Sequence, residues 1–113
     1  MANLRVETST SDEVTVVAIA GDLDLAGAGV LDRALEQAWS GDARALVLDL
    51  RDVEFMDSSG LRVIIVASQR AEKDARRFAL VPGKAQVMRV FEITRMEERL
   101  HFVEDPAELG RAR

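Results

Sequence analysis

The chain has 113 residues, a net charge of −5 and no cysteine, and 48% of its residues are hydrophobic. This length suits one domain, and the apolar content is sufficient for a core without disulfides. The negative charge argues against a protein that binds nucleic acid directly, because phosphates require clustered cations. Residues 1–13 lack the basic and apolar segments of a signal peptide, and no apolar stretch approaches the roughly 20 residues that span a bilayer. We therefore expect one cytoplasmic domain over residues 1–113, without membrane contact.

The first half of the chain predicts two strands, a helix and a third strand. Residues 3–9 alternate between polar and apolar side chains, and residues 13–21 are rich in β-branched residues. Asp12 lies between them as a turn former, so the two strands are expected to pair as a hairpin. Apolar residues recur at helical spacing over 26–39. Residues 43–50 then form a nearly all-apolar strand, which is typical of a strand buried on both faces.

The second half continues this alternation. The expected elements are a helix over 60–76, a strand over 77–81, a helix around 87–91, a strand over 100–104 and a weak helix over 106–112. The order ββαβαβαβα predicts a single α/β domain. Its mixed sheet is expected to have about five strands, covered by helices mainly on one side.

The segment Met-Asp-Ser-Ser-Gly at residues 56–60 joins the third strand to the second helix. One of its serines, Ser58 or Ser59, is suited to cap the helix, because the first helical N–H groups lack partners within the helix. The other interpretations are a catalytic nucleophile and a site of modification. A nucleophilic serine needs a base, but the only histidine, His101, falls in the last expected strand, and the G-x-S-x-G motif is missing. We therefore expect no enzyme activity and no catalytic residues.

Carboxylates gather after two of the expected strands and raise the alternative of a Mg²⁺ site. These residues are Asp22, Asp24, Asp49, Asp52, Glu54 and Asp57. In this interpretation Asp49 would resemble the acceptor aspartate of a response-regulator receiver domain. However, the paired acids after the first strand and the lysine after the last full strand, both typical of receivers, are missing here. The acidic residues are therefore expected to form loops and surface charges, with no metal and no cofactor.

Three segments of the sequence resemble the signature blocks of the STAS family, in particular the bacterial anti-sigma factor antagonists. They are GDLDL at 21–25, LVLDLRDVEFMDSSGLRVII at 46–65 and VMRVFEITRM at 87–96. The resemblance covers essentially the whole chain in order. Family members often have glycine after the second helix, where residues 74–78 here read DARRF, and in the third block, where this chain has Arg95.

The resemblance implies a binding protein that is switched by phosphorylation. Its unphosphorylated form would bind an anti-sigma factor, itself often a serine kinase, and so free a sigma factor. The kinase would then phosphorylate Ser58, with Ser59 as the second choice, and a metal-dependent serine phosphatase would remove the phosphate. A phosphate at a helix N-terminus is expected to be tolerated by the free N–H groups and the helix dipole, so the switch would act at the surface.

The resemblance also implies a partner-binding face around the second helix. Its expected members are Asp22, Asp24, Asp57, Ser59, Gly60, Leu61 and Arg62. Core packing of Leu61 remains an alternative, as does a role of Asp22 and Asp24 in turns and caps, and Gly60 is expected to keep the acceptor hydroxyl accessible. The alternative function is a STAS scaffold or ligand-binding module of a transporter or stressosome assembly, without a kinase-driven switch. The protein is expected to be a monomer or a weak dimer.

Overall fold

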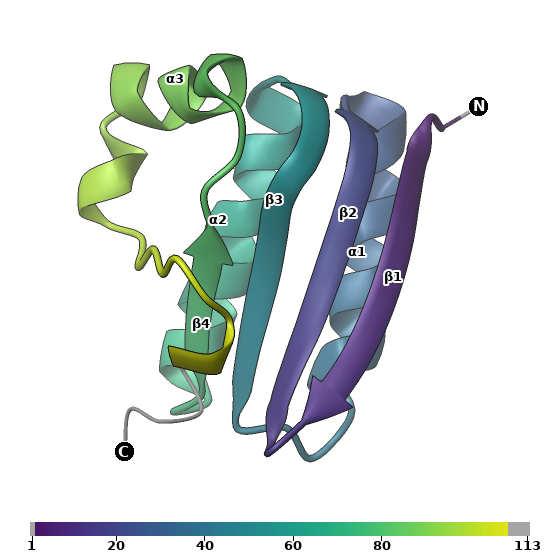
Figure 1. Cartoon of the computed structure of the whole chain (residues 1–113), viewed down its shortest axis with the longest axis vertical. Coiled ribbons are helices and arrows are strands. Elements are labelled where there is room, and N and C mark those ends of the chain that lie inside the picture. Colours follow the sequence, from purple (N-terminus) through teal and green to yellow (C-terminus); the bar gives the residue numbers. More distant parts are fainter. Residues whose placement is uncertain (1, 109–113) are drawn as a thin grey trace.

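The computed structural model describes residues 2–108, which form a four-stranded mixed sheet with helices on one face (Figure 1). The strand order is β1-β2-β3-β4, with β1 antiparallel to β2 and the other neighbouring strands parallel. In chain order the elements are β1 (Leu4–Ser11), β2 (Val14–Leu23), α1 (Leu25–Trp39), β3 (Ala45–Met56), α2 (Ser58–Lys73), β4 (Arg77–Val81), α3 (Ala85–Ile93) and the 3₁₀ helix η1 (Met96–Glu98). The predicted single α/β domain with a mixed sheet is confirmed, but the predicted strand count of about five is wrong.

The predicted hairpin of β1 and β2 is present and closes more tightly than the sequence suggested. Ser11 lies opposite Val14, so only Asp12 and Glu13 form the turn. Both turn residues have positive φ, 51° and 66°, as a two-residue turn with the twist of a hairpin requires. The backbone carbonyl of Glu13 also accepts hydrogen bonds from the N–H groups of the segment that leads into β3.

The core lies between the sheet and the helices α1 and α2, which run behind the sheet in Figure 1. Alternation along β3 places Leu46, Leu48 and Leu50 in this core, while Ala45 and Val47 point to the opposite face. On that opposite face the C-terminal segment contributes Val103, which packs with a smaller buried cluster. The first part of β3 is therefore buried on both faces, as its nearly all-apolar sequence predicts.

The fifth predicted strand, over 100–104, is reduced to a single bridge between Phe102 and Leu80 of β4. Leu80 donates to the His101 carbonyl and accepts from Val103, both at 2.9 Å. Beyond this point Asp105 accepts a hydrogen bond from the N–H of Ala107 and turns the chain, which ends the pairing. Of the helix predicted over 106–112, two residues are helical, and residues 109–112 lie outside the described part of the chain.

β3 continues six residues beyond the predicted end at residue 50, to Met56. The polar residues after Leu50 look like a loop in the sequence, because aspartate and glutamate are rare in strands. Two register shifts in the pairing of β2 with β3 keep the strands together and still bury Val53 and Met56. In the described residues 2–108, no helix is both long and apolar enough to cross a membrane.

The C-terminal end of α1 is held by the tryptophan Trp39, which is 4% exposed. Its ring lies 6.3 Å from the ring of Phe78 in β4, and the guanidinium of Arg76 lies 5.3 Å from its centre. Arg76 also donates to the carbonyls of Trp39, at 2.7 Å, and Gly41. Arg76 thus supplies hydrogen bonds to carbonyls that a helix end leaves without partners.

Ala75 and Arg95 adopt left-handed backbone conformations, with φ of 56° and 62°. Both follow helices, α2 and α3, at the two places where members of the STAS family, which the sequence resembles, often have glycine. An L-residue with a side chain is strained there, whereas glycine is not. We predict that Ala75→Gly and Arg95→Gly each stabilise the fold by about 1 kcal/mol, measured by urea denaturation.

The matched control for this prediction is Ala26→Gly, in the exposed first turn of α1, where φ is not positive. The same change should lower stability there, because glycine loses more backbone entropy on folding. Equal effects at Ala75 and Ala26 would contradict the strain at Ala75.

Candidate functional site

Two helix N-termini lie side by side at the C-terminal ends of the parallel strands, which form the upper end of the sheet in Figure 1. The parallel strands β2 and β3 end opposite each other, at Leu23 and Met56. Each strand is followed by an aspartate in extended conformation, Asp24 or Asp57, that caps the next helix. Because helix N-termini carry partial positive charge, both carboxylates are favourably placed.

The caps satisfy most of the N–H groups at the start of α2. The Asp57 carboxylate accepts hydrogen bonds from the N–H groups of Ser59, at 2.8 Å, and Gly60, at 3.4 Å. The N–H of Asp57 donates to the carbonyl of Leu23 at 3.3 Å, which ties the start of α2 to the end of β2. In α1, Asp24 accepts from the N–H of Gly27 at 2.9 Å.

The helix cap is therefore Asp57, and the expectation that Ser58 or Ser59 caps α2 is wrong. Aspartate and serine are both good caps, and the one with extended backbone takes the role. Ser58 becomes the first helical residue, and its side chain is exposed. Within residues 2–108 its hydroxyl has no hydrogen-bond partner, whereas Ser59 is half-buried. The structure therefore presents the Ser58 hydroxyl to solvent on an ordered helix start.

Gly60 allows the start of α2 to pack against β2. A Cβ at this position would lie 2.5 Å from Leu23 Cγ and 2.9 Å from the Leu23 carbonyl oxygen. Gly27 has the same role in α1, where a Cβ would lie 2.2 Å from the carbonyl oxygen of Asp22. Gly60 is buried, so its first role is close packing of helix on strand, and it does not itself form part of the exposed surface.

The remaining residues expected on the partner face divide into exposed and buried positions. Arg62 is exposed, one helical turn after Ser58. Asp22 is half-buried and accepts a hydrogen bond from the Asn3 side chain at 3.0 Å. Leu61 is only 6% exposed and belongs to the core, so the packing alternative holds for its side chain.

Two exposed apolar residues next to the caps were missed in the sequence. Leu25, directly after Asp24, is 77% exposed, and Phe55, directly before Met56, is 50% exposed. Phe55 lies opposite Asp22 in the pairing of β3 with β2. Because Met56 is buried, strand alternation alone would have placed Phe55 outside, had the strand been predicted to reach this point.

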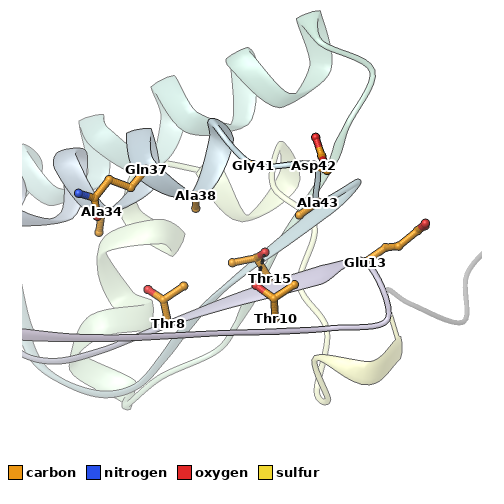
Figure 2. Close-up of a pocket in the computed structure, with 10 residues that line it drawn as sticks. All are labelled: Thr8, Thr10, Glu13, Thr15, Ala34, Gln37, Ala38, Gly41, Asp42 and Ala43. Carbon is orange, nitrogen blue, oxygen red and sulfur yellow. Dashed lines mark hydrogen bonds between the residues drawn. The ribbon is translucent and has the colours of Figure 1, made fainter.

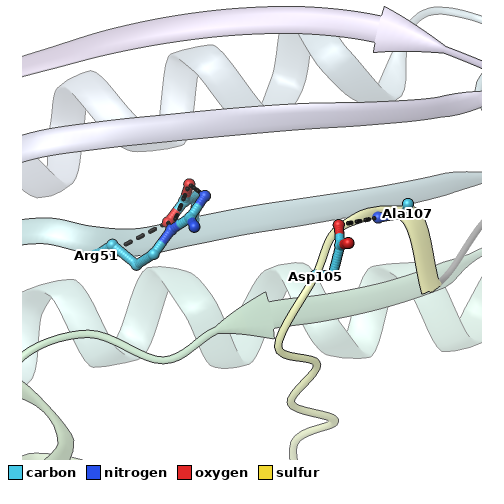
Figure 3. Close-up of polar contacts among 4 residues, drawn as sticks. Arg51, Asp105 and Ala107 are labelled. Carbon is cyan, nitrogen blue, oxygen red and sulfur yellow. Dashed lines mark hydrogen bonds and ion pairs between the residues drawn. The ribbon is translucent and has the colours of Figure 1, made fainter.

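The alternative acceptor Asp49 is held in a different environment, in β3 opposite Ala18 and Val81. Burial acts to raise the pKa of its carboxyl, but hydrogen bonds from the Arg51 side chain and backbone, and the Arg51 charge, outweigh burial and lower it. The Arg51 Nη2 lies 2.7 Å from Asp49 Oδ2. Figure 3 shows Arg51 along β3, on the face that the C-terminal turn with Asp105 approaches.

Asp49 thus lies several residues before the strand end at Met56, not among the capped helix starts. In residues 2–108 no three His, Cys, Asp or Glu side chains are grouped so that they could hold a metal ion. Lys84 forms an ion pair with Glu54, which connects the start of α3 to β3. The arrangement of a receiver domain is therefore not present in the described residues.

Comparison with known proteins identifies the family. The sequence profile of the STAS domain matches residues 5–109, so the chain belongs to the STAS domain family. An anti-sigma-B factor antagonist of Staphylococcus aureus is 26% identical over 102 residues, which cover 90% of this chain and 94% of that protein. The anti-sigma-F factor antagonist RsfB of Mycobacterium tuberculosis is 32% identical over 68 residues, covering 60% of this chain and 56% of RsfB.

Solved structures share the fold. The crystal structure of an anti-sigma factor antagonist from Mycobacterium paratuberculosis superposes with a TM-score of 0.85 at 24% identity, covering 96% of this chain and 92% of that one. The unphosphorylated form of the Bacillus anti-sigma factor antagonist SpoIIAA gives a TM-score of 0.78 at 19% identity, covering 95% of each chain. At these identities the similarity establishes the fold alone.

We predict that Gly60→Ala destabilises the protein by about 1–3 kcal/mol, because the added methyl must displace the Leu23 backbone or α2. Urea denaturation measures the effect. Gly29→Ala, at an exposed position in α1 with nothing within 4 Å of the added Cβ, is the matched control. It should stabilise by up to about 1 kcal/mol through helix propensity. Equal effects at Gly60 and Gly29 would contradict the close-packing role.

Proposed function

We propose that this protein is an anti-sigma factor antagonist whose binding is controlled by phosphorylation of Ser58. The unphosphorylated form binds an anti-sigma factor that is also a serine kinase, and so frees a sigma factor. Phosphorylation by that kinase ends binding, and a metal-dependent serine phosphatase restores it. The names of the relatives support the general function, since they are anti-sigma factor antagonists.

The observation that carries the choice of Ser58 is the exposed hydroxyl at the first position of α2. Because Asp57 supplies the cap, modification of Ser58 removes no hydrogen bond to a described residue. Ser59 is the weaker candidate, because it is half-buried. A kinase can therefore reach Ser58 without unfolding the helix start.

The phosphate changes the charge of this surface more than its structure. It adds about −1.5 to −2 charges at neutral pH beside Asp57 and near Asp24. The helix dipole and Arg62, four residues further along α2, offset part of this repulsion within the domain. Only the Ser58 N–H remains without a described partner at this helix start, so fewer free N–H groups stabilise the phosphate than the sequence suggested.

In a partner protein that covers this surface, no comparable positive charge offsets the repulsion by the phosphate. Close contact with a phosphate requires desolvation and places like charges together, which is able to change affinity by orders of magnitude. Asp22, Asp24 and Asp57 form the acidic part of the contact surface, and Leu25 and Phe55 provide the apolar anchors. Ser59 and Arg62 also belong to this contact surface, and the buried residues Gly60 and Leu61 pack beneath it.

We predict that ATP and the cognate kinase label the wild-type protein and Ser59→Ala, whereas Ser58→Ala is not labelled and stays bound to the kinase. The melting temperature of the phosphorylated protein should remain close to that of the unmodified protein. A large drop in melting temperature would show that the switch acts by unfolding. Failure of every co-encoded kinase to bind or label the protein would favour a STAS scaffold or ligand-binding module.

The apolar anchors give a second prediction. Phe55→Ala and Leu25→Ala should each weaken anti-sigma factor binding by about tenfold, measured by calorimetry, with little change in melting temperature. Val66→Ala is the matched control, because Val66 is 51% exposed but lies two turns further along α2. Equal losses of affinity in Val66→Ala and Phe55→Ala would contradict a binding anchor beside the capped starts of α1 and α2.

A further inference from the structure

The two edges of the sheet differ in how they are protected. At β4 the C-terminal segment pairs with Leu80 through the bridge at Phe102. At β1 none of the residues 2–108 pairs with the outer side of the strand. β1 pairs with β2 over eight residues without a register shift, and it contains neither proline nor lysine. Of the features that usually prevent edge strands from pairing with other chains, it has two charged side chains, Arg5 and Glu7, but no bulge, proline or lysine.

The pairing with β2 determines which backbone groups of β1 point outward. Ser11 and Val14 close the two-residue turn, and Asp22 donates to the carbonyl of Asn3. Hydrogen bonding alternates along an antiparallel pair, so the odd-numbered residues of β1 bond to β2. The N–H and C=O groups of the even-numbered residues, Leu4, Val6, Thr8 and Thr10, consequently point to the free edge.

The side chains of β1 are complementary to a second, antiparallel copy of the same strand. If Val6 lies opposite Val6 of the second copy, Leu4 lies opposite Thr8 of the second copy, and the outward backbone groups of all these residues pair. In this register Arg5 faces Glu7 of the second copy, and Glu7 faces its Arg5. Both side chains are exposed, on the face away from the helices, where each opposite-charge pair is stabilising.

The helix side of the same edge is hollowed. A cleft of about 430 Å³ lies between the hairpin and the last turns of α1, with Thr8 and Thr10 pointing into it (Figure 2). A second hollow, of about 330 Å³, continues along Val6 and Thr8 beside Val30 of α1. Val6 is only half-buried at this edge, so a second strand would cover apolar surface.

We propose that β1 pairs with β1 of a second copy of this chain, in a two-fold symmetric dimer with a continuous sheet. The register has Val6 on the two-fold axis, so the contact is closed and self-complementary. Two cross-strand ion pairs, between Arg5 of one copy and Glu7 of the other, fix this register on one face. The dimer does not involve Ser58 or the capped starts of α1 and α2, and it does not depend on the proposed function.

The test exchanges the charges of Arg5 and Glu7 in the full chain. Sedimentation at micromolar to sub-millimolar protein concentration then measures the dissociation constant of the dimer. Arg5→Glu alone and Glu7→Arg alone should each raise the dimer dissociation constant by about tenfold or more, because like charges then face each other. The double variant Arg5→Glu/Glu7→Arg should restore the dimer. An equimolar mixture of the two single variants should form heterodimers, since each charge then meets its opposite.

A backbone variant tests the same contact without changing charge. Val6→Pro removes an outward N–H that β2 does not use, so it should abolish the dimer and leave the monomer folded by circular dichroism. A wild-type protein that is monomeric at all concentrations would overturn the proposal. So would single charge variants that dimerise as tightly as the wild type, or an equimolar mixture that remains monomeric.

Discussion

The hydrogen bond from the N–H of Asp57 to the carbonyl of Leu23 ties the start of α2 to the end of β2. It can form only because β2 and β3 end in register and because Gly60 leaves room for α2 beside Leu23. Asp57 can then cap α2, and the following serine is free of any structural task. The exposure of Ser58 is thus a consequence of how two strands end.

The two capped helices also explain the repeated strand-aspartate pattern of the sequence. Asp24 and Asp57 follow Leu23 and Met56, which face each other in the sheet. Each aspartate caps a helix, so these carboxylates stabilise the fold. At the same time they make the surface around the two helix N-termini acidic. Replacing either aspartate by alanine would therefore remove a helix cap and a negative surface charge at the same time.

Much of this architecture could be predicted from the sequence, and the differences have physical causes. The hairpin and the three main helices follow from periodicity and turn residues, whereas Ser58 as a phosphorylation site follows from the family resemblance and stays a prediction. The cap could not be assigned, because Asp57 and Ser58 are both good caps and only backbone conformation separates them. The extension of β3 was missed because paired neighbours and bulges override the low strand propensity of Asp52 and Glu54. The exposure of Phe55 was missed for the same reason, because strand alternation places it outside only once β3 is known to reach Met56. For Leu61 the sequence left core packing and surface exposure open, and the contacts of α2 with the sheet decide for the core.

Trp39 is the only tryptophan of the chain, and it lies between Arg76 and Phe78 at the C-terminal end of α1. A helix of 15 residues is about 22 Å long, so the indole is far from the capped start of the same helix. Intrinsic fluorescence therefore reports whether the lower half of the domain is folded. It is insensitive to events at Ser58 that leave the fold intact, and optical detection of those events requires a reporter placed at the opposite end of the sheet.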